Sequence, residues 1–248
     1  LSDKENELER KIMRITGRGA GFHNSIYGGH WLRDGLTNER VQAIRDGDFG
    51  DMFIGDSIGD GDFVIAHFDY FYNRFSNTSD VFSRHHIVLI PRTANSSEFQ
   101  YGLHGEMKCY AYSPIRSQGE RSYNIQSVLK NAKLYDHYCT MERIMIKNDE
   151  TKQMAICSNV EKSHVECMSA KMVFGFDPDC GNNYRVDTAS ETQFAIFRLA
   201  PEHIAVDRYY WLSNSWDENR SFFVDKAGYI REANRTARFC LRPYFVIG

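Results

Sequence analysis

The chain has 248 residues, of which 42% are hydrophobic and 25% charged, and its formal net charge is −3 at pH 7. This composition is typical of a folded globular protein and excludes a disordered one. The small negative charge offers nothing that would attract nucleic acid or anionic lipid. No apolar run approaches the roughly 18 residues of a membrane span, and no signal peptide is recognisable. We therefore expect no nucleic-acid partner and no membrane insertion.

The first residues predict a short amphipathic helix over residues 2–16. Ser2 and Glu5 form a capping box, and apolar residues then recur at helical spacing as far as Ile15. A stripe this small cannot build a core alone and needs a partner surface. We expect residues 1–47 to be an assembly arm that contacts equivalent helices of a homotrimer or other homo-oligomer, or a neighbouring protein.

A glycine-rich stretch over residues 17–35 predicts irregular backbone with several positive φ angles. A second helix is predicted over residues 38–46, with Val41 and Ile44 facing inward and Gly47 ending it. The remainder, residues 48–248, is the predicted second domain.

Strand-like segments and one further helix fill this second domain. Helical spacing returns over residues 124–139. The predicted strands are rich in β-branched and aromatic residues, and they are MFIGD (52–56), DFVIAHFDYFYN (62–73), RHHIVLIP (84–91), RIMI (143–146), FAIF (194–197), YYWLS (209–213), SFFVD (221–225) and RPYFVIG (242–248). Strands that pair at long range around two or three helices predict an α+β fold with a mainly antiparallel, twisted sheet.

No segment carries a recognisable metal or cofactor motif. The stretch DSIGDGD, which starts at Asp56, lacks the spacing of a calcium loop and reads as a polar turn, as does FDPDCGNN from Phe176. The six cysteines form no C-x-x-C pair, and we interpret them as free thiols. We expect no metal and no cofactor.

The sequence also offers no nucleophile with a plausible base. His85 and His86 are consecutive, so on a strand they point to opposite faces and do not readily bind one metal ion. Phosphate-binding loops, dinucleotide fingerprints and hydrolase motifs are absent from the sequence. We expect no catalytic residues and a protein that is not an enzyme.

The segment from Tyr209 onward combines apolar strands with a dense polar loop. In a strand, Arg231, Ala233 and Arg235 would share one face, and Glu232 and Asn234 the other. The loop over residues 213–220 would stand beside this strand, so that the two polar stretches form one patch. The predicted ligand-binding residues are Asn214, Trp216, Asp217, Asn219, Arg220, Arg231, Glu232, Asn234 and Arg235. The alternative is that these residues only solvate an exposed edge strand.

The apolar part of the same strands predicts a scaffold. Its residues are Tyr210, Trp211, Leu212, Phe222, Val224, Leu241 and Phe245.

The final forty residues resemble the terminal segment of C-type-lectin-like domains in bacteriophage structural proteins, a group related to the major tropism determinant and to formylglycine-generating enzymes. The shared pattern is an aromatic-Trp-Leu strand, a polar loop, an apolar strand with Phe and Val, a glycine turn, a polar strand and a closing Arg-Pro-x-Phe. These are Tyr210 to Leu212, Phe222 to Val224, Gly228, residues 229–237 and Arg242 to Phe245 here.

Earlier segments resemble the same phage proteins in the same order. They are GAGFHNSIYGGHWL, IRDGDFGDMFIGD, FDYFYN with HHIVLIP, YSPIRS, and MVFGF with TQFAIFRLAP. Two departures limit what the likeness implies. Trp216 to Asn219 reads WDEN rather than the Trp-Asn-Asp of calcium-dependent lectins. GGHW and the lone Cys240 do not match the Arg-Gly-Gly-Ser-Trp block and cysteine pair of formylglycine-generating enzymes.

The resemblance implies a virion protein, assembled in the host cytoplasm, that displays a lectin-like module on a phage head or tail. Its implied partners are other virion structural proteins and a host cell-surface protein or glycan. Two alternatives remain open from the sequence: a purely structural capsid or tail subunit whose polar patch contacts other virion proteins, and a lectin-fold enzyme of the formylglycine-generating type.

Overall fold

A computed structural model describes residues 19–59, 61–72, 83–94, 98–100, 141–148, 154–163, 166–178, 191–216 and 219–248. For residues 99–100, 141–148, 154–163 and 215 it describes the backbone alone. The predicted helices over residues 2–16 and 124–139 lie outside the described residues.

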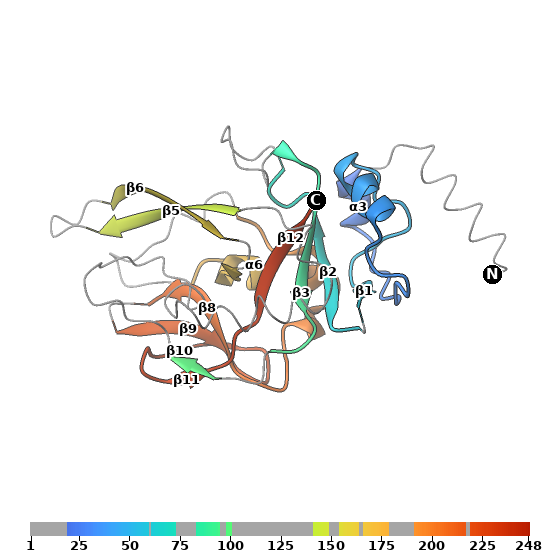
Figure 1. Ribbon diagram of the computed structural model, residues 1–248. Helices are drawn as coiled ribbons and strands as arrows, with labels where there is room; N and C mark the ends of the chain where they lie inside the picture. The colour runs from blue at the N-terminus through green and yellow to red at the C-terminus, as the bar shows by residue number, and fades with distance from the viewer. Residues whose placement is uncertain are drawn as a thin grey trace.

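A five-stranded antiparallel sheet forms the centre of the fold. In spatial order its strands are β1 (Ser57–Ile58), β2 (Phe63–Phe68), β3 (Ile87–Pro91), β12 (Pro243–Ile247) and β7 (Glu166–Cys167). Figure 1 shows β12 running beside β3, with β2 and β1 beyond it. Phe245 of β12 lies opposite Leu89 of β3, and both side chains are fully buried. The strands are near-continuous apolar runs because both faces of this sheet are covered.

A second, three-stranded antiparallel sheet carries the segment that the resemblance singled out. Its order is β10 (Ile230–Asn234), β9 (Arg220–Val224) and β8 (Tyr210–Ser215). In Figure 1 it lies below and to the left of the central sheet. Two ribbons complete the described strands: β11 (Arg238–Phe239) with β4 (Phe99–Gln100), and β5 (Met141–Asn148) with β6 (Met154–Ser163).

The described helices are short. They are α2 (Ala20–His23), α3 (Asn38–Arg45), α6 (Ala170–Phe174), α7 (Ala195–Leu199) and the 3₁₀-helix η3 (Pro201–His203). The prediction for α3 is confirmed. The Thr37 hydroxyl accepts a hydrogen bond from the Arg40 amide at its start, Val41 and Ile44 are buried, and Gly47 follows its end with φ of 75°.

Two predicted strands are wrong. FAIF belongs to α7, which begins after Phe194, because a four-residue apolar run has no periodicity that separates a buried strand from a buried helical turn. MFIGD contributes only an isolated bridge between Ile54 and Tyr27, since Gly55 has φ of 84° and turns the chain before β1 begins.

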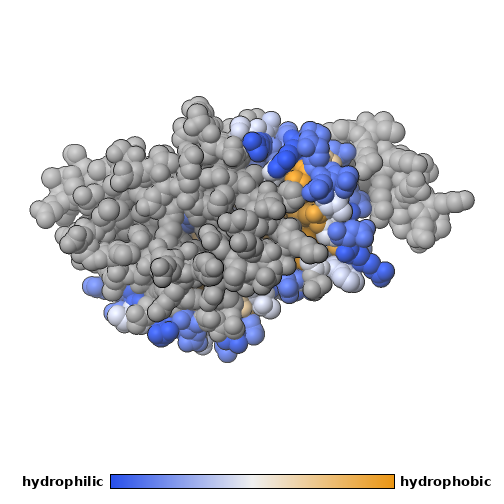
Figure 2. Space-filling view, viewed as in Figure 1, coloured by the Kyte–Doolittle hydropathy of each residue, from blue (hydrophilic) through white to orange (hydrophobic). Residues whose placement is uncertain are grey.

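One hydrophobic core joins the described elements. Val41 and Ile44 of α3 lie in the same buried cluster as Ile65 of β2, Phe197 of α7 and Leu212 of β8. In Figure 2 hydrophilic residues cover the outer side of α3, while apolar surface lies between α3 and β2. The fold class is therefore α+β with mainly antiparallel sheets, as the sequence predicts. The division of the chain at residue 47 stays a prediction.

Two further findings concern only the described residues. Cys167 and Cys240 are buried, and Cys240 is a free thiol. No helix in the described ranges is long and apolar enough to cross a membrane.

Candidate functional site

The β8–β9–β10 sheet displays two different faces, and its register assigns residues to each. Directly opposite residues of antiparallel strands point to the same side. Ile230 lies opposite Val224, and Glu232 opposite Phe222, so these four share what we call the Trp216 face. Arg231 lies opposite Phe223, which lies opposite Trp211, and these three define the Phe223 face.

On the Trp216 face the predicted site residues contact one another. The Trp216 ring packs against Phe222 with ring centroids 5.6 Å apart, and the Arg220 guanidinium carbon lies 5.4 Å from the Trp216 centroid. Arg220 Nη1 also lies 2.8 Å from Glu232 Oε1 in an exposed ion pair. Trp216 is therefore half-buried and held by its neighbours, with Arg220 and Glu232 at the surface.

Two predicted surface residues are in fact buried, so the surface assignment is wrong for them. Asn214 is 5% exposed, and its Oδ1 accepts a 2.6 Å hydrogen bond from the amide of Ala170 at the start of α6. Arg235 is 7% exposed, and its Nε donates to the Ser221 hydroxyl at 3.1 Å. Both residues join neighbouring segments of the fold. Alternation along β10 did not predict the burial of Arg235, because Arg235 lies beyond the end of that strand.

The remaining predicted site residues divide between exposed and undescribed positions. Asn219, Asn234 and Arg231 are exposed. The Asn234 side chain accepts hydrogen bonds from the amide and hydroxyl of Thr236, so it also orders the turn after β10. Asp217 lies outside the described residues.

The predicted scaffold is confirmed, since every member is buried. The seven residues are Tyr210, Trp211, Leu212, Phe222, Val224, Leu241 and Phe245, each at most 4% exposed.

The Phe223 face carries an aromatic cluster that the sequence analysis did not assign to a site. The Phe223 and Phe239 rings lie 4.3 Å apart, and Tyr209 lies 5.7 Å from Phe223. Tyr209 is 42% exposed, and Tyr229, which lies against Arg231, is 62% exposed. The signal in the sequence was the pair Tyr209-Tyr210, because consecutive strand residues point to opposite faces and only one of the two can be inside.

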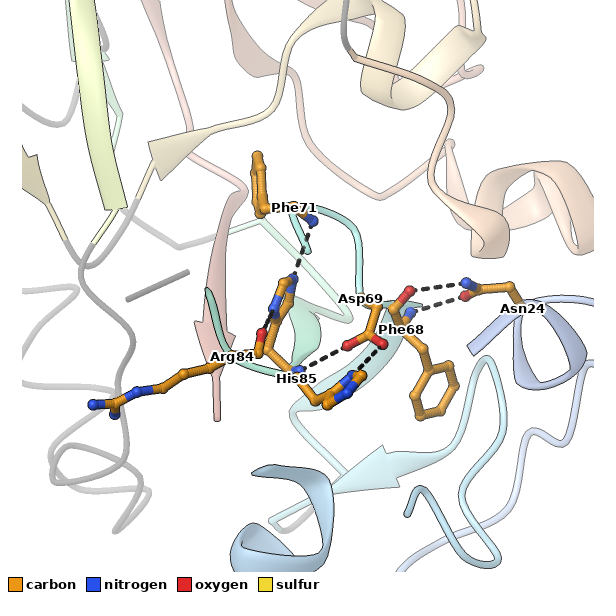
Figure 3. A network of polar contacts seen from close by, with 7 residues as sticks. Asn24, Phe68, Asp69, Phe71, Arg84 and His85 are labelled. Carbon is orange, nitrogen blue, oxygen red and sulfur yellow. Dashed lines mark hydrogen bonds and ion pairs between the residues drawn. The ribbon is translucent and has the colours of Figure 1, made fainter. Parts of the chain in front are cut away.

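The two histidines of the RHHIVLIP segment make structural hydrogen bonds around Asp69 (Figure 3). His85 Nδ1 lies 2.7 Å from Asp69 Oδ2, and the His86 amide donates to Asp69 Oδ1 at 2.9 Å. The His86 ring accepts at Nε2 from the Phe71 amide, so its Nδ1 carries the proton and donates to the Arg84 carbonyl. Asp69 has φ of 55°, a conformation that aspartate tolerates.

These bonds explain why the two side chains diverge. His86 is fully buried with both ring nitrogens engaged, whereas His85 is half-exposed and stacks on Tyr72 with ring centroids 4.1 Å apart. Among the described residues, no three His, Cys, Asp or Glu side chains are grouped so that they could hold a metal ion. The geometry agrees with the interpretation of this segment as the start of a buried strand, β3.

Asp56, the first residue of DSIGDGD, is hydrogen-bonded to the glycine-rich stretch over residues 17–35. It is fully buried, and it accepts hydrogen bonds from the amides of His30 at 2.9 Å and Phe53 at 2.8 Å. Burial raises the pKa of its carboxyl, and these two hydrogen bonds act in the opposite direction. A Cβ on Gly28 would come within 2.5 Å of Asp56 Oδ1, so only glycine fits there.

A second connection joins the arm to η3. The Tyr27 hydroxyl lies 2.9 Å from His203 Nε2. Burial, and secondarily the Arg242 charge, lower the pKa of His203, so the neutral imidazole is favoured. The pKa of the Tyr27 hydroxyl is raised, first by burial and then by the nearby Glu202 charge.

No protein-family model matches the chain, and neither a curated protein nor a solved structure matches it.

Proposed function

We propose that the chain is a virion-surface protein of a bacteriophage, and that residues 48–248 form a C-type-lectin-like module for attachment to the host surface. The arm over residues 1–47 contacts equivalent arms of a homo-oligomer or other virion proteins. The module binds a host cell-surface protein or glycan and performs no catalysis. Assembly takes place in the host cytoplasm.

The order of elements after Tyr209 is the observation that supports this proposal. The aromatic-Trp-Leu segment forms β8, the polar loop follows it, and the Phe-Val segment lies in β9. Gly228 has φ of 84° in the turn to the polar strand β10, and the closing Arg-Pro-x-Phe leads into β12.

The chemistry of the sheet supports binding rather than a reaction. Its described charged groups pair with one another across strands, as Arg220 does with Glu232 and Arg231 with Asp225. Trp, Tyr and Arg side chains are the types that contribute most to binding energy at interfaces, and this sheet carries the half-buried Trp216 and the exposed Arg231.

Competition for adsorption tests the proposal. The chain should be present in purified particles, and an excess of the pure chain should reduce adsorption of those particles to host cells. Many copies on one particle raise the effective affinity by about 10²–10⁴, so the pure chain must be in large molar excess. Absence of the chain from purified particles would contradict a virion role.

A double variant separates attachment from the structural alternative. In particles that carry Trp216→Ala and Arg231→Ala, each face of the sheet has lost one side chain that would contact the ligand. If Trp216 is a hot spot, its loss alone weakens binding by about 2 kcal/mol. We expect reduced adsorption with normal incorporation. Unchanged adsorption by fully loaded particles would instead favour a capsid or tail subunit whose patch contacts other virion proteins.

A further inference from the structure

The Phe223 face carries several hydrogen-bond donors that the protein itself does not use. Lys226 Nζ lies 5.8 Å from the centroid of the Tyr209 ring and, within the described chain, makes no hydrogen bond or ion pair. Arg231 uses Nε toward Asp225 Oδ2 at 3.2 Å, which leaves its two Nη groups without an acceptor in the described residues. The hydroxyls of Tyr209 and Tyr229 likewise donate to no described acceptor.

Lys226 lies beside Tyr209, and Arg231 lies opposite Phe223, so these two donors border an aromatic surface. Phe223 and Phe239 are half-buried, with Trp211 fully buried beneath them at 4.6 Å from Phe239. Tyr209 borders this surface at 5.6 Å from Phe239.

The β9–β10 turn positions the donors beside the rings. The Asp225 amide donates to the Tyr229 carbonyl at 2.9 Å, and Asp225 Oδ1 accepts from the amides of Ala227 and Tyr229, so the turn is fixed by its own backbone. The Arg231 guanidinium carbon lies 5.5 Å from the Tyr229 centroid. The turn and Arg231 are therefore held in place before any ligand arrives, which lowers the entropy cost of binding.

We propose that the Phe223 face binds an acidic oligosaccharide, with the sugar rings on Tyr209, Phe223 and Tyr229 and the acidic groups on Lys226 and Arg231. This inference rests on the proposed function and names the ligand class of its module. The hydrocarbon face of a sugar ring packs on aromatic rings as other apolar surface does. A carboxylate or sulfate accepts from the Arg231 Nη groups and the Lys226 ammonium, and both kinds of bond are charge-assisted.

The size of the surface favours a saccharide over a protein. A standard protein interface uses about 20–30 residues on each side. The surface defined here has six side chains: Tyr209, Phe223, Lys226, Tyr229, Arg231 and Phe239. A ligand of a few sugar units matches that number.

The Trp216 face is a poorer candidate for this ligand, although it carries the tryptophan. Its one described cation, Arg220, lies over the Trp216 ring and pairs with Glu232, whereas the Phe223 face has Lys226 in addition to Arg231, which pairs with Asp225. An acidic ligand there would have to displace Glu232 and uncover Trp216.

A glycan array probed with the whole chain tests the inference. The array carries uronic-acid, sulfated and sialylated oligosaccharides beside neutral counterparts, for example trigalacturonate beside its methyl ester. We expect acidic members to bind at least tenfold more tightly than their neutral counterparts, and added salt to weaken binding. Equal binding of both classes, binding of neither, or capture of a host protein alone would overturn the inference.

Single variants then locate the binding face. Lys226→Gln and Tyr229→Ala should each lower the affinity for the best acidic glycan about tenfold, because each removes one contact without touching the core. Arg33→Gln, which removes an exposed charge outside this sheet, is the matched control and should change it less than twofold. Glu232→Gln tests the Trp216 face, and a loss of affinity larger than those of Lys226→Gln and Tyr229→Ala would assign the ligand to that face and overturn the inference.

The two proposals fail separately. A chain that competes for adsorption but binds no acidic glycan overturns only the ligand assignment. A chain that binds acidic glycans but is missing from particles overturns only the virion role.

Discussion

Arg242 is a fully buried cation that donates hydrogen bonds to three backbone carbonyls. Its Nε donates to the Pro91 carbonyl at 3.0 Å, and its Nη groups donate to the carbonyls of His203 and Arg92. The guanidinium also lies 5.5 Å from the Tyr210 ring centroid. Burial lowers the pKa of Arg242. This one side chain therefore connects three segments. They are the end of β3 with the residue after it, the helix η3, and the segment that leads into β12.

Replacing Arg242 should be costly for this reason. Arg242→Met fills similar space but leaves the Pro91, His203 and Arg92 carbonyls without their donors, and each buried polar group left unpaired costs about 1–3 kcal/mol. We expect the free energy of unfolding to fall by at least about 3 kcal/mol, measured by denaturant titration. Arg238→Met is the exposed control and should change it by about 0.5 kcal/mol or less. Similar stability of both variants would contradict this account.

At the level of elements, the glycine-rich arm is held against the central sheet by close packing around one tyrosine. The Tyr27 ring lies against Gly55, where an added Cβ would come within 2.2 Å of Tyr27 Cε2. Tyr27 also forms an isolated parallel bridge with Ile54. The arm can approach β1 this closely because residue 55 has no side chain.

A pair of glycine substitutions isolates this packing. Gly55→Ala and Gly59→Ala both add a methyl group at a positive φ, 84° and 70°, so both pay about 1–2 kcal/mol of backbone strain. Gly59 has nothing within 4 Å of the added Cβ, whereas Gly55→Ala must also displace Tyr27. We expect Gly55→Ala to lower the melting temperature clearly more than Gly59→Ala. Equal losses would show that the Tyr27 contact is unimportant.

The sequence was informative where local chemistry decides structure. Residues 38–46 have a capping Thr37, helical apolar spacing and a final glycine, and they form α3. It was misleading for residues 194–197, because four apolar residues fit a strand or a helical turn equally well. For the site, alternation along β10 correctly separated Arg231 from Glu232. Phe239 of β11 packs on Trp211 and Phe223 of this sheet, and no local pattern contains that long-range contact.

For the whole molecule, the half-buried His203 links stability to pH. Its pKa is lowered in the folded state, mainly by burial, so the unfolded chain binds the proton more readily. Unfolding is then favoured as pH falls below the ordinary histidine value of about 6.5. Burial raises the pKa of Asp56, so this carboxyl has the opposite effect on stability. The folded chain gains stability from Asp56 as pH falls toward the ordinary aspartate value of about 4.

Denaturation at several pH values checks this linkage. We expect the free energy of unfolding of the wild-type chain to fall between pH 7.5 and pH 5.5, and His203→Gln to reduce that slope because glutamine does not titrate. The Tyr27 hydroxyl still finds a hydrogen-bonding partner in glutamine, so the variant should remain folded. An unchanged slope in the variant would assign the pH dependence to other groups.

The position of β12 in the central sheet has a consequence for synthesis of the chain on the ribosome. β2 and β3 are close in sequence and can pair early, but Phe245 pairs with Leu89, which was made 156 residues before it. At about 5–20 residues per second, β3 waits about 8–30 s with one hydrogen-bonding edge open and four apolar residues, Ile87 to Ile90, unburied. An open, apolar strand edge is a template for aggregation. The nascent chain should therefore bind chaperones during this interval. Faster translation, or a chaperone that binds β3 early, should raise the yield of folded protein.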